Sequence, residues 1–300
     1  MMAPVVSVVV ATYRREQSLV KALHSLAAQT FRNFEIILVD DNDDPLWNEK
    51  VYAIKDAFLK EHEDIPLIHI ANHPNQGSAN ARNIGIAAAN GDYITFLDDD
   101  DLYLPEKIQH QVTFMQMGEY DYSITDLYLY NAEEKIIDRR IRSYIQKTTQ
   151  DALQRYHLLY HLTGTDTMMF KKSYLLQIGC FAPIDVGDEY YLMQRAIEGG
   201  GRFGYSHGCD VKAYVHTGDG GLSSGQGKID GENRLYTYKK QFFSEIAAKD
   251  RRYITMRHYA VIAFAQLRSR RYFAFIKNAA WSFASSPMQC ARLLLDRSCL

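Results

Sequence analysis

Two kinds of apolar pattern alternate along the first hundred residues. Residues 5–11 (VVSVVVA) and 35–39 (EIILV) are continuous runs rich in β-branched side chains, which is typical of strands buried on both faces. Between them, leucine and alanine recur at helical spacing over residues 16–28. The same alternation predicts a helix around 47–61, a strand near 67–70, a helix from Ser78 and a strand over 93–97. Strands that alternate with helices favour βαβ units and a mostly parallel sheet.

The pattern is less regular after residue 105. Pro105 can occupy the first turn of a helix that extends to about Met117. Further elements are predicted as strands over 121–130, 165–171 and 209–216, helices over 173–178 and 188–198, and mainly helical structure over 232–285. We therefore expect an α/β fold in which helices flank a mostly parallel central sheet, with a helical C-terminal extension.

Composition is that of a globular protein that needs no disulfides. Of the 300 residues, 47% are hydrophobic and 23% charged, and the mean hydropathy is −0.30, which argues against disordered and fibrous classes. The four cysteines form no C-x-x-C pair. The chain starts without a basic segment and cleavage site, and no apolar run reaches the roughly 18 residues of a membrane span. These features predict a cytoplasmic protein.

Charge is distributed unevenly, although the formal net charge is only −2. Residues 251–300 hold nine Lys or Arg and one acid, so the first 250 residues carry a formal charge of −10. Large aromatic side chains lie among the basic ones, which suits peripheral contact with an anionic membrane surface. It suits equally a helical subdomain that packs its apolar stripe on the rest of the protein. No basic stripe runs through the body, which argues against nucleic acid as a partner.

Polar clusters follow three of the predicted strands. They are Thr12-Tyr13, Asp40-Asp41 and the four aspartates Asp98 to Asp101. In parallel sheets, ligands bind beyond the carboxyl ends of the strands, so these clusters predict one site. Adjacent carboxylates repel unless a cation or donors compensate, and Mg²⁺ is commonly held by carboxylates together with substrate phosphates. The alternative is an acidic turn that caps the helix at Pro105.

An ordered set of motifs resembles the inverting family-2 glycosyltransferases. The set comprises the opening VSVVVATYRREQSLVKALHSLAAQTFRNFEIILVDD, the segment NQGSANARN at 75–83 and FLDDDD at 96–101. The resemblance covers roughly residues 5–220. It implies a GT-A fold, a nucleotide-sugar donor and Mn²⁺ or Mg²⁺ as cofactor.

The resemblance also assigns roles to individual residues. Thr12 and Tyr13 would line the base pocket, and Asp41 would hydrogen-bond the nucleobase. Arg82 would lie near the base and phosphates. The family's D-x-D motif falls on Asp98-Asp99-Asp100, in which Asp98 would hold the ribose and Asp100 the metal. His216, before a glycine-rich loop, resembles the histidine that reaches the metal or diphosphate.

Inversion at an anomeric carbon needs a base that removes the proton of the attacking hydroxyl. The resemblance identifies Asp188 and Glu189 as candidates, because Leu192 and Arg195 follow them at the family's spacing. Their order is swapped relative to the commonest pattern, so either acid can be the base. Both also favour a helix N-terminus for purely structural reasons.

The resemblance thus predicts a metal-dependent inverting transferase that moves a sugar, most simply from a UDP-sugar, to a hydroxyl of a glycan or lipid-linked saccharide. It divides the chain into a catalytic domain over 1–225, with a nucleotide-binding half to about 104 and an acceptor-binding half after it, and a helical region over 226–300. Two alternatives stay open. An Asp-nucleophile phosphohydrolase also places D-x-D after a buried strand, and a GT-A domain can bind nucleotide or glycan without turnover.

Overall fold

The computed structural model describes residues 4–184, 187–215 and 225–298. The chain divides into two compact units. The first unit comprises Met1–Leu153 and Leu162–Val215, and the second comprises Gln154–His161 and His216–Leu300. The short segment 154–161 therefore belongs with the C-terminal helices, although it lies in the middle of the sequence.

A seven-stranded sheet forms the centre of the first unit. Its strands, in spatial order, are β10 (Phe203–Ser206), β6 (Tyr122–Thr125), β9 (Met168–Lys171), β4 (Tyr93–Phe96), β1 (Val6–Thr12), β2 (Phe34–Asp40) and β3 (Leu67–Ala71). Only β9 runs antiparallel to its neighbours in this sheet. The mostly parallel sheet predicted from the alternation of elements is confirmed.

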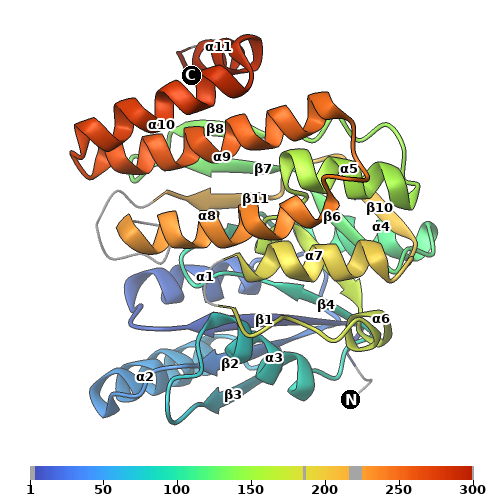
Figure 1. Cartoon of the computed structure of the whole chain (residues 1–300). Coiled ribbons are helices and arrows are strands. Elements are labelled where there is room, and N and C mark those ends of the chain that lie inside the picture. The colour runs from blue at the N-terminus through green and yellow to red at the C-terminus, as the bar shows by residue number, and fades with distance from the viewer. Residues whose placement is uncertain (1–3, 185–186, 216–224, 299–300) are drawn as a thin grey trace. The chain divides into compact units, whose positions relative to one another are not determined.

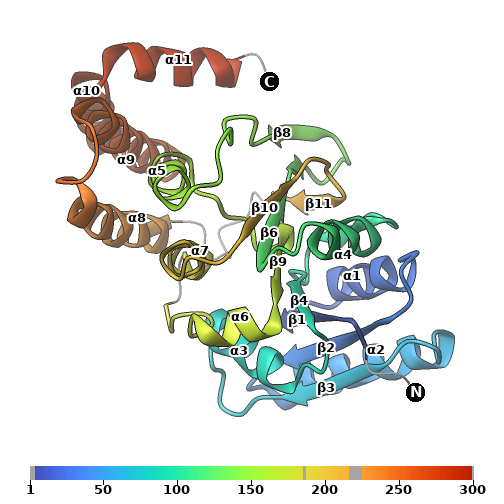
Figure 2. The same cartoon turned by 90° about the vertical axis from the view of Figure 1, so that its right-hand side faces the viewer.

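Helices cover both faces of this sheet (Figure 2). One face carries α1 (Gln17–Ala27), α2 (Pro45–Glu61) and α4 (Lys107–Met117), and the other carries α3 (Ser78–Ala88), α6 (Lys172–Gln177) and α7 (Asp188–Glu198). Because side chains alternate along a strand, Val8 packs with the α1 leucines while Val9 meets α3. The close approach of α3 depends on Gly85, where an added Cβ would lie 2.5 Å from Val9 Cγ1.

A second, four-stranded sheet also belongs to the first unit. Its strands, in spatial order, are β5 (Leu102–Tyr103), β11 (Val211–Tyr214), β7 (Leu127–Tyr130) and β8 (Ile136–Arg140). The single strand predicted over 121–130 is wrong, because the chain passes from β6 into β7 at Asp126. The carboxylate of that buried residue accepts hydrogen bonds from the Tyr205 hydroxyl at 2.6 Å and the Arg142 amide at 3.0 Å, which fixes the break.

The second unit is helical, and this confirms the predicted C-terminal extension. Its helices are α8 (Gly225–Lys239), the 3₁₀ turn η2 (Lys240–Phe242), α9 (Ala248–Arg268), α10 (Tyr272–Ser285) and α11 (Pro287–Ser298). Both α8 and α10 pack along α9 (Figure 1). The end of α5 (Gln150–Tyr160) joins this unit through Arg155, which donates two hydrogen bonds to Asp250 at 2.7 and 2.9 Å. Across the described residues, no helix combines the length and apolar character needed to span a membrane.

Candidate active site

The polar clusters singled out in the sequence lie at one edge of the seven-stranded sheet. Strands β1, β2 and β4 are mutually parallel, so their carboxyl ends share an edge. Thr12 ends β1, Asp40 ends β2, and the aspartates from Asp98 onward follow β4 directly. The common site predicted for these residues therefore has the geometry expected of a ligand site in a parallel sheet.

Arg82, on α3, joins this edge to the start of α7. Its Nη2 donates to Asp98 Oδ1 and its Nη1 to Asp188 Oδ2, each at 2.7 Å. The Arg82 side chain is only 11% exposed. Burial by itself lowers the pKa of Arg82, but the two carboxylates outweigh that effect and raise it. The arginine is thus a fixed cation between two acids that lie 90 residues apart in the sequence.

Three carboxylates converge behind the D-x-D motif. Oxygen atoms of Asp98, Asp101 and Asp166 lie within 4.8 Å of one another, and the Asp98 amide donates to Asp166 Oδ1 at 2.6 Å. Burial, together with the negative charge of Asp98, raises the pKa of Asp166 to about 7. Burial and the Asp166 carboxylate raise the pKa of Asp101 well above its ordinary value. Carboxylates that resist ionisation in this way are short of positive charge, which is the condition that a divalent cation corrects.

Asp99, the middle residue of the D-x-D motif, is hydrogen-bonded to the end of β1. Asp99 Oδ2 accepts the Thr12 hydroxyl at 2.7 Å and the Tyr13 amide at 3.3 Å. Burial raises the pKa of Asp99 to about 7. Arg15 Nη2 donates to Asp100 Oδ2 at 3.0 Å, so Asp100 lies beside a cation and outside the three-carboxylate cluster. The Tyr13 ring is 44% exposed and can offer a stacking face.

Asp41 organises the loop that follows β3. Its Oδ1 accepts the side-chain amide of Asn72 and the backbone amide of Gln76, and its Oδ2 accepts the backbone amide of Gly77, all at 2.9 Å. These bonds hold residues 72–77 against the end of β2. The Asp41 carboxylate thus already accepts three hydrogen bonds within the protein. Its contact with a nucleobase remains a prediction.

The two candidate bases begin α7. Gly187, in the left-handed region at φ 82°, precedes Asp188, the first helical residue. Asp188 is 5% exposed and paired with Arg82, whereas Glu189 is partly exposed. Burial raises the pKa of Glu189 to about 8, and its hydrogen bond with the Asp188 carboxylate adds to that effect. Of the two acids, Glu189 is therefore the one with the properties of a proton acceptor near neutral pH.

Sequence reasoning missed three residues of this edge. Asp166 falls inside the strand predicted over 165–171, whereas it lies in the 3₁₀ turn Thr165–Thr167 before β9. Arg15 is one of two adjacent arginines, and Lys107 has the sequence context of an ordinary helix residue. Lys107 is in fact buried, and its Nζ donates to Tyr103 Oη at 2.9 Å, beneath the acidic turn. Of these three residues, only Arg15 had a signal in the sequence, because the Tyr-Arg-Arg run directly follows the end of β1. His216 lies outside the described residues.

Comparison with protein families and curated proteins identifies relatives. The family model described as Glycosyl transferase family 2 matches residues 7–175. The Escherichia coli protein "UDP-Glc:alpha-D-GlcNAc-diphosphoundecaprenol beta-1,3-glucosyltransferase WfaP" is 32% identical over 125 residues, which are 41% of this chain and 46% of that protein. "Glycosyltransferase GlyG" of Streptococcus pneumoniae is 35% identical over 133 residues, 44% of this chain and 42% of that protein. The chain thus spans less than half the length of these two relatives.

Two solved structures resemble the whole chain. Staphylococcus aureus TarS residues 1–349, in complex with UDP-GlcNAc, superposes with a TM-score of 0.60 at 15% identity and covers 95% of this chain and 91% of that one. The mannosyltransferase PcManGT of Pyrobaculum calidifontis, in complex with GDP-Man and Mn²⁺, gives a TM-score of 0.55 at 16% identity and covers 99% of this chain and 80% of that one. At such identities the likeness establishes the fold, and it confirms the fold class expected from the sequence.

Proposed function

Since this chain belongs to glycosyl transferase family 2, we propose that it moves a sugar from a UDP-sugar to a hydroxyl of a glycan or lipid-linked saccharide. Its fold is of the GT-A type. The donor and acceptor classes draw support from the name of the E. coli relative and from the UDP-GlcNAc bound to TarS. A lipid-linked acceptor favours a role in surface polysaccharide biosynthesis. Family membership argues against the phosphohydrolase alternative.

The pair of ion pairs made by Arg82 is the observation that carries this proposal. It links the D-x-D turn and the first residue of α7 through the two terminal nitrogens of one guanidinium group. A UDP-sugar held by the turn would present its anomeric carbon between the diphosphate and the acids of α7. The resemblance to the family implies that Arg82 also meets phosphate oxygens, which guanidinium groups bind well.

Glu189 is the base in this scheme. It takes the proton of the acceptor hydroxyl as the oxygen attacks the anomeric carbon, while the bond from that carbon to the diphosphate breaks on the opposite face. An α-linked donor then gives a β-linked product. Asp188 serves as the permanent partner of Arg82 and, through its negative charge, keeps the proton affinity of Glu189 high.

A divalent cation, Mn²⁺ or Mg²⁺, fits the chemistry of this edge. The carboxylates of Asp98, Asp101 and Asp166 would supply hard oxygen ligands, and Asp100 is the further ligand implied by the family motif. Burial and mutual repulsion raise the pKa values of Asp101 and Asp166, and a bound cation would favour their ionised forms. When bound, the cation would neutralise charge on the departing diphosphate.

The proposal is tested by donor turnover. Purified protein with Mn²⁺ is incubated with a panel of UDP-sugars and lipid-linked saccharide acceptors, and released UDP is measured for the wild type, Glu189→Gln and Glu198→Gln. We expect Glu189→Gln to slow release by about 100-fold or more while UDP affinity is retained, because general base catalysis typically contributes 10²- to 10⁴-fold. Glu198, exposed at the other end of α7, is the matched control.

Two outcomes of that experiment contradict the proposal. Equal rates for wild type and Glu189→Gln would remove Glu189 from the chemistry. UDP binding with no release from any donor in the wild type would favour the alternative of a domain that binds without turnover.

We further propose that α10 meets an anionic membrane surface. Several large apolar residues of this helix are exposed, and we call them the α10 face: Tyr272, Phe273, Ile276, Trp281 and Phe283. Phe273 is 85% exposed, which is unusual for a phenylalanine in a helix that packs on a neighbour. Arg268, Arg270 and Arg271, all exposed, lie at the turn before α10, and Lys277 lies within it. Basic residues beside exposed aromatics favour the interface of an anionic bilayer.

Vesicle sedimentation tests this proposal. We expect the wild type to bind vesicles that contain anionic lipid, to release them at high salt, and to bind neutral vesicles weakly. Phe273→Asp with Ile276→Asp should abolish binding, whereas Met117→Asp, at an exposed apolar residue of α4, should not change it. Equal sedimentation of all three proteins, or self-association through the α10 face in the absence of lipid, would contradict it.

A further inference from the structure

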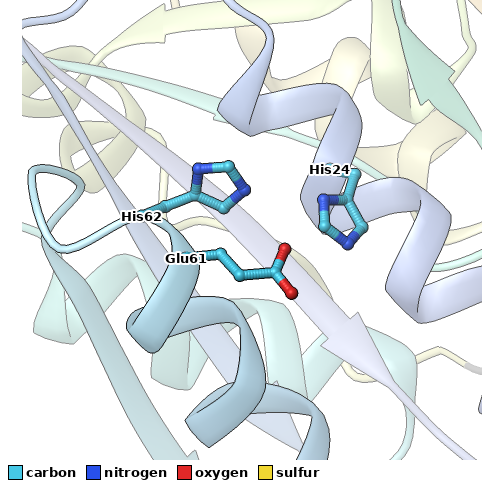
Figure 3. Close-up of side chains that lie close together, drawn as sticks. All are labelled: His24, Glu61 and His62. Carbon is cyan, nitrogen blue, oxygen red and sulfur yellow. The ribbon is translucent and has the colours of Figure 1, made fainter.

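A second cluster of metal-ligating side chains lies on α1 and α2, apart from the candidate catalytic acids at the turn after β4 and the start of α7. His24 on α1, Glu61 at the end of α2 and His62 immediately after it converge, with one ligand atom from each lying within 4.8 Å of the others (Figure 3). We propose that these residues bind a divalent transition-metal ion and that Zn²⁺ is the ion that the donor set fits best. Imidazole nitrogen suits Zn²⁺, and two histidines with one glutamate are a known protein ligand set for it.

The fold brings the three residues together. Helices α1 and α2 each follow a parallel strand and run back along the sheet, so both end at the edge opposite the carboxyl ends of the strands. The buried stripe of α1 faces the sheet, which leaves His24 on the exposed side next to α2. Phe58 packs beside both histidines, with ring centroids 6.2 Å from His24 and 4.9 Å from His62, and the two imidazole centroids lie 5.6 Å apart. The site therefore lies at the edge of the sheet opposite the candidate active site.

Unsatisfied polar atoms give independent support. His62 Nε2 is buried and has no hydrogen-bond partner among the described residues. Figure 3 shows a ring nitrogen of His62 directed toward His24. Within the part of the chain that the structure describes, no ion pair or hydrogen bond involves the Glu61 carboxylate. A buried nitrogen lone pair without a donor costs stability, and a metal bond would satisfy it.

The separation of the ligands is close to what Zn²⁺ requires. Zinc–nitrogen and zinc–oxygen bonds of about 2.0–2.2 Å in a tetrahedron place ligand atoms about 3.4 Å apart. His24 and Glu61 are exposed and can rotate to close the remaining distance, whereas His62 is held against Phe58. Water would complete the coordination, because the cluster supplies three ligands. The bound ion would cross-link the ends of α1 and α2.

The test measures Zn²⁺ binding by the untagged 300-residue protein, using calorimetric titration and thermal unfolding. Excess Mg²⁺ is present throughout to occupy the carboxylates of the catalytic edge, since Mg²⁺ prefers oxygen ligands. The variants are His24→Ala, Glu61→Gln and, as matched control, Glu63→Gln, which removes an exposed carboxylate two residues away. Co²⁺ replaces Zn²⁺ in a parallel experiment to report the coordination geometry by its visible absorption.

We expect the wild type and Glu63→Gln each to bind one Zn²⁺ ion. His24→Ala and Glu61→Gln should not bind it at the same concentration. Zn²⁺ should raise the melting temperature of the two binding proteins, because a ligand that binds only the folded state stabilises it. Affinity should fall by more than about 100-fold in His24→Ala, beyond the 10- to 100-fold typical of an outer-shell partner. Zn²⁺ affinity in His24→Ala and Glu61→Gln equal to that of the wild type would overturn the proposal, as would a Co²⁺ complex without nitrogen coordination.

Discussion

Arg82 is the residue on which the geometry of the candidate site depends most. It is the common partner of Asp98 and Asp188, and removing it would leave both carboxylates, of which that of Asp188 is buried, without their shared cation. Loss of one partner from a buried charge network typically costs 3–5 kcal/mol, and we expect the lower end here because Asp98 is about one-third exposed. Urea unfolding of Arg82→Ala should thus show stability reduced by about 3 kcal/mol. A change below about 0.5 kcal/mol would contradict this account of the site.

Glu189 makes the pH dependence of the reaction predictable. Its pKa of about 8 means that the free enzyme holds the carboxyl largely protonated at neutral pH, although a base must be ionised. We therefore expect kcat/KM to rise with pH and to level off above about 8. A profile that is flat from pH 6 to 9 would contradict the assignment of the base.

The same shift has a consequence for stability, with a definite sign. A carboxyl whose folded pKa lies above its ordinary value of 4.5 binds a proton more tightly in the folded state. Its contribution to stability is complete below pH 4.5 and is lost as the pH rises toward 8. We therefore expect the free energy of unfolding of Glu189→Gln, relative to that of the wild type, to increase as the pH rises from 4.5 to about 8. Urea unfolding of both proteins across this pH range measures the difference.

At the scale of elements, a close backbone approach fixes the turn before β4. A Cβ added to Gly91 would lie 2.7 Å from the Ser7 backbone nitrogen, while the Gly91 amide donates to Ser7 Oγ at 2.9 Å. Ser7 Oγ in turn donates to buried Glu35 at 2.6 Å. Gly91→Ala should lower the free energy of unfolding by about 1–3 kcal/mol, as overpacking does. Asp92→Ala, at the exposed neighbouring residue, should change the free energy of unfolding by no more than about 0.5 kcal/mol. Equal stabilities of the two variants would contradict the close contact between Gly91 and Ser7.

The elements that could be predicted are those with a long apolar pattern. Strands β1 and β2 are seven-residue runs buried almost throughout, and α1 carries a clear apolar stripe. Strand β10 has only four residues, and β8 is mostly exposed, so neither leaves a periodic signal. Helix α5 also went unpredicted.

The same distinction applies to the candidate site. Residues at strand ends, such as Thr12 and Asp98, could be grouped because parallel strands share an edge. Asp166 and the pairing of Arg82 with Asp188 could not, because they depend on how segments distant in sequence pack. The sequence could not choose between Asp188 and Glu189 either, since the choice rests on which acid Arg82 neutralises.

At the scale of the whole molecule, two kinds of chemistry are carried by two units. The first unit holds the acidic edge proposed to bind the donor, and the second holds the basic and aromatic α10 face. This division accounts for the uneven charge seen in the sequence. The central claim nevertheless concerns the first unit alone: its acids and Arg82 form a metal-dependent site for a uridine diphosphate sugar.

Calorimetric titration of UDP, with GDP as control, tests that claim most directly. The titration is made with and without Mn²⁺ on the wild type and on Asp100→Ala. We expect the wild type to bind UDP more tightly than GDP, Mn²⁺ to strengthen the binding, and Asp100→Ala to lose the Mn²⁺ effect. Absence of nucleotide binding under every metal condition would contradict the donor site.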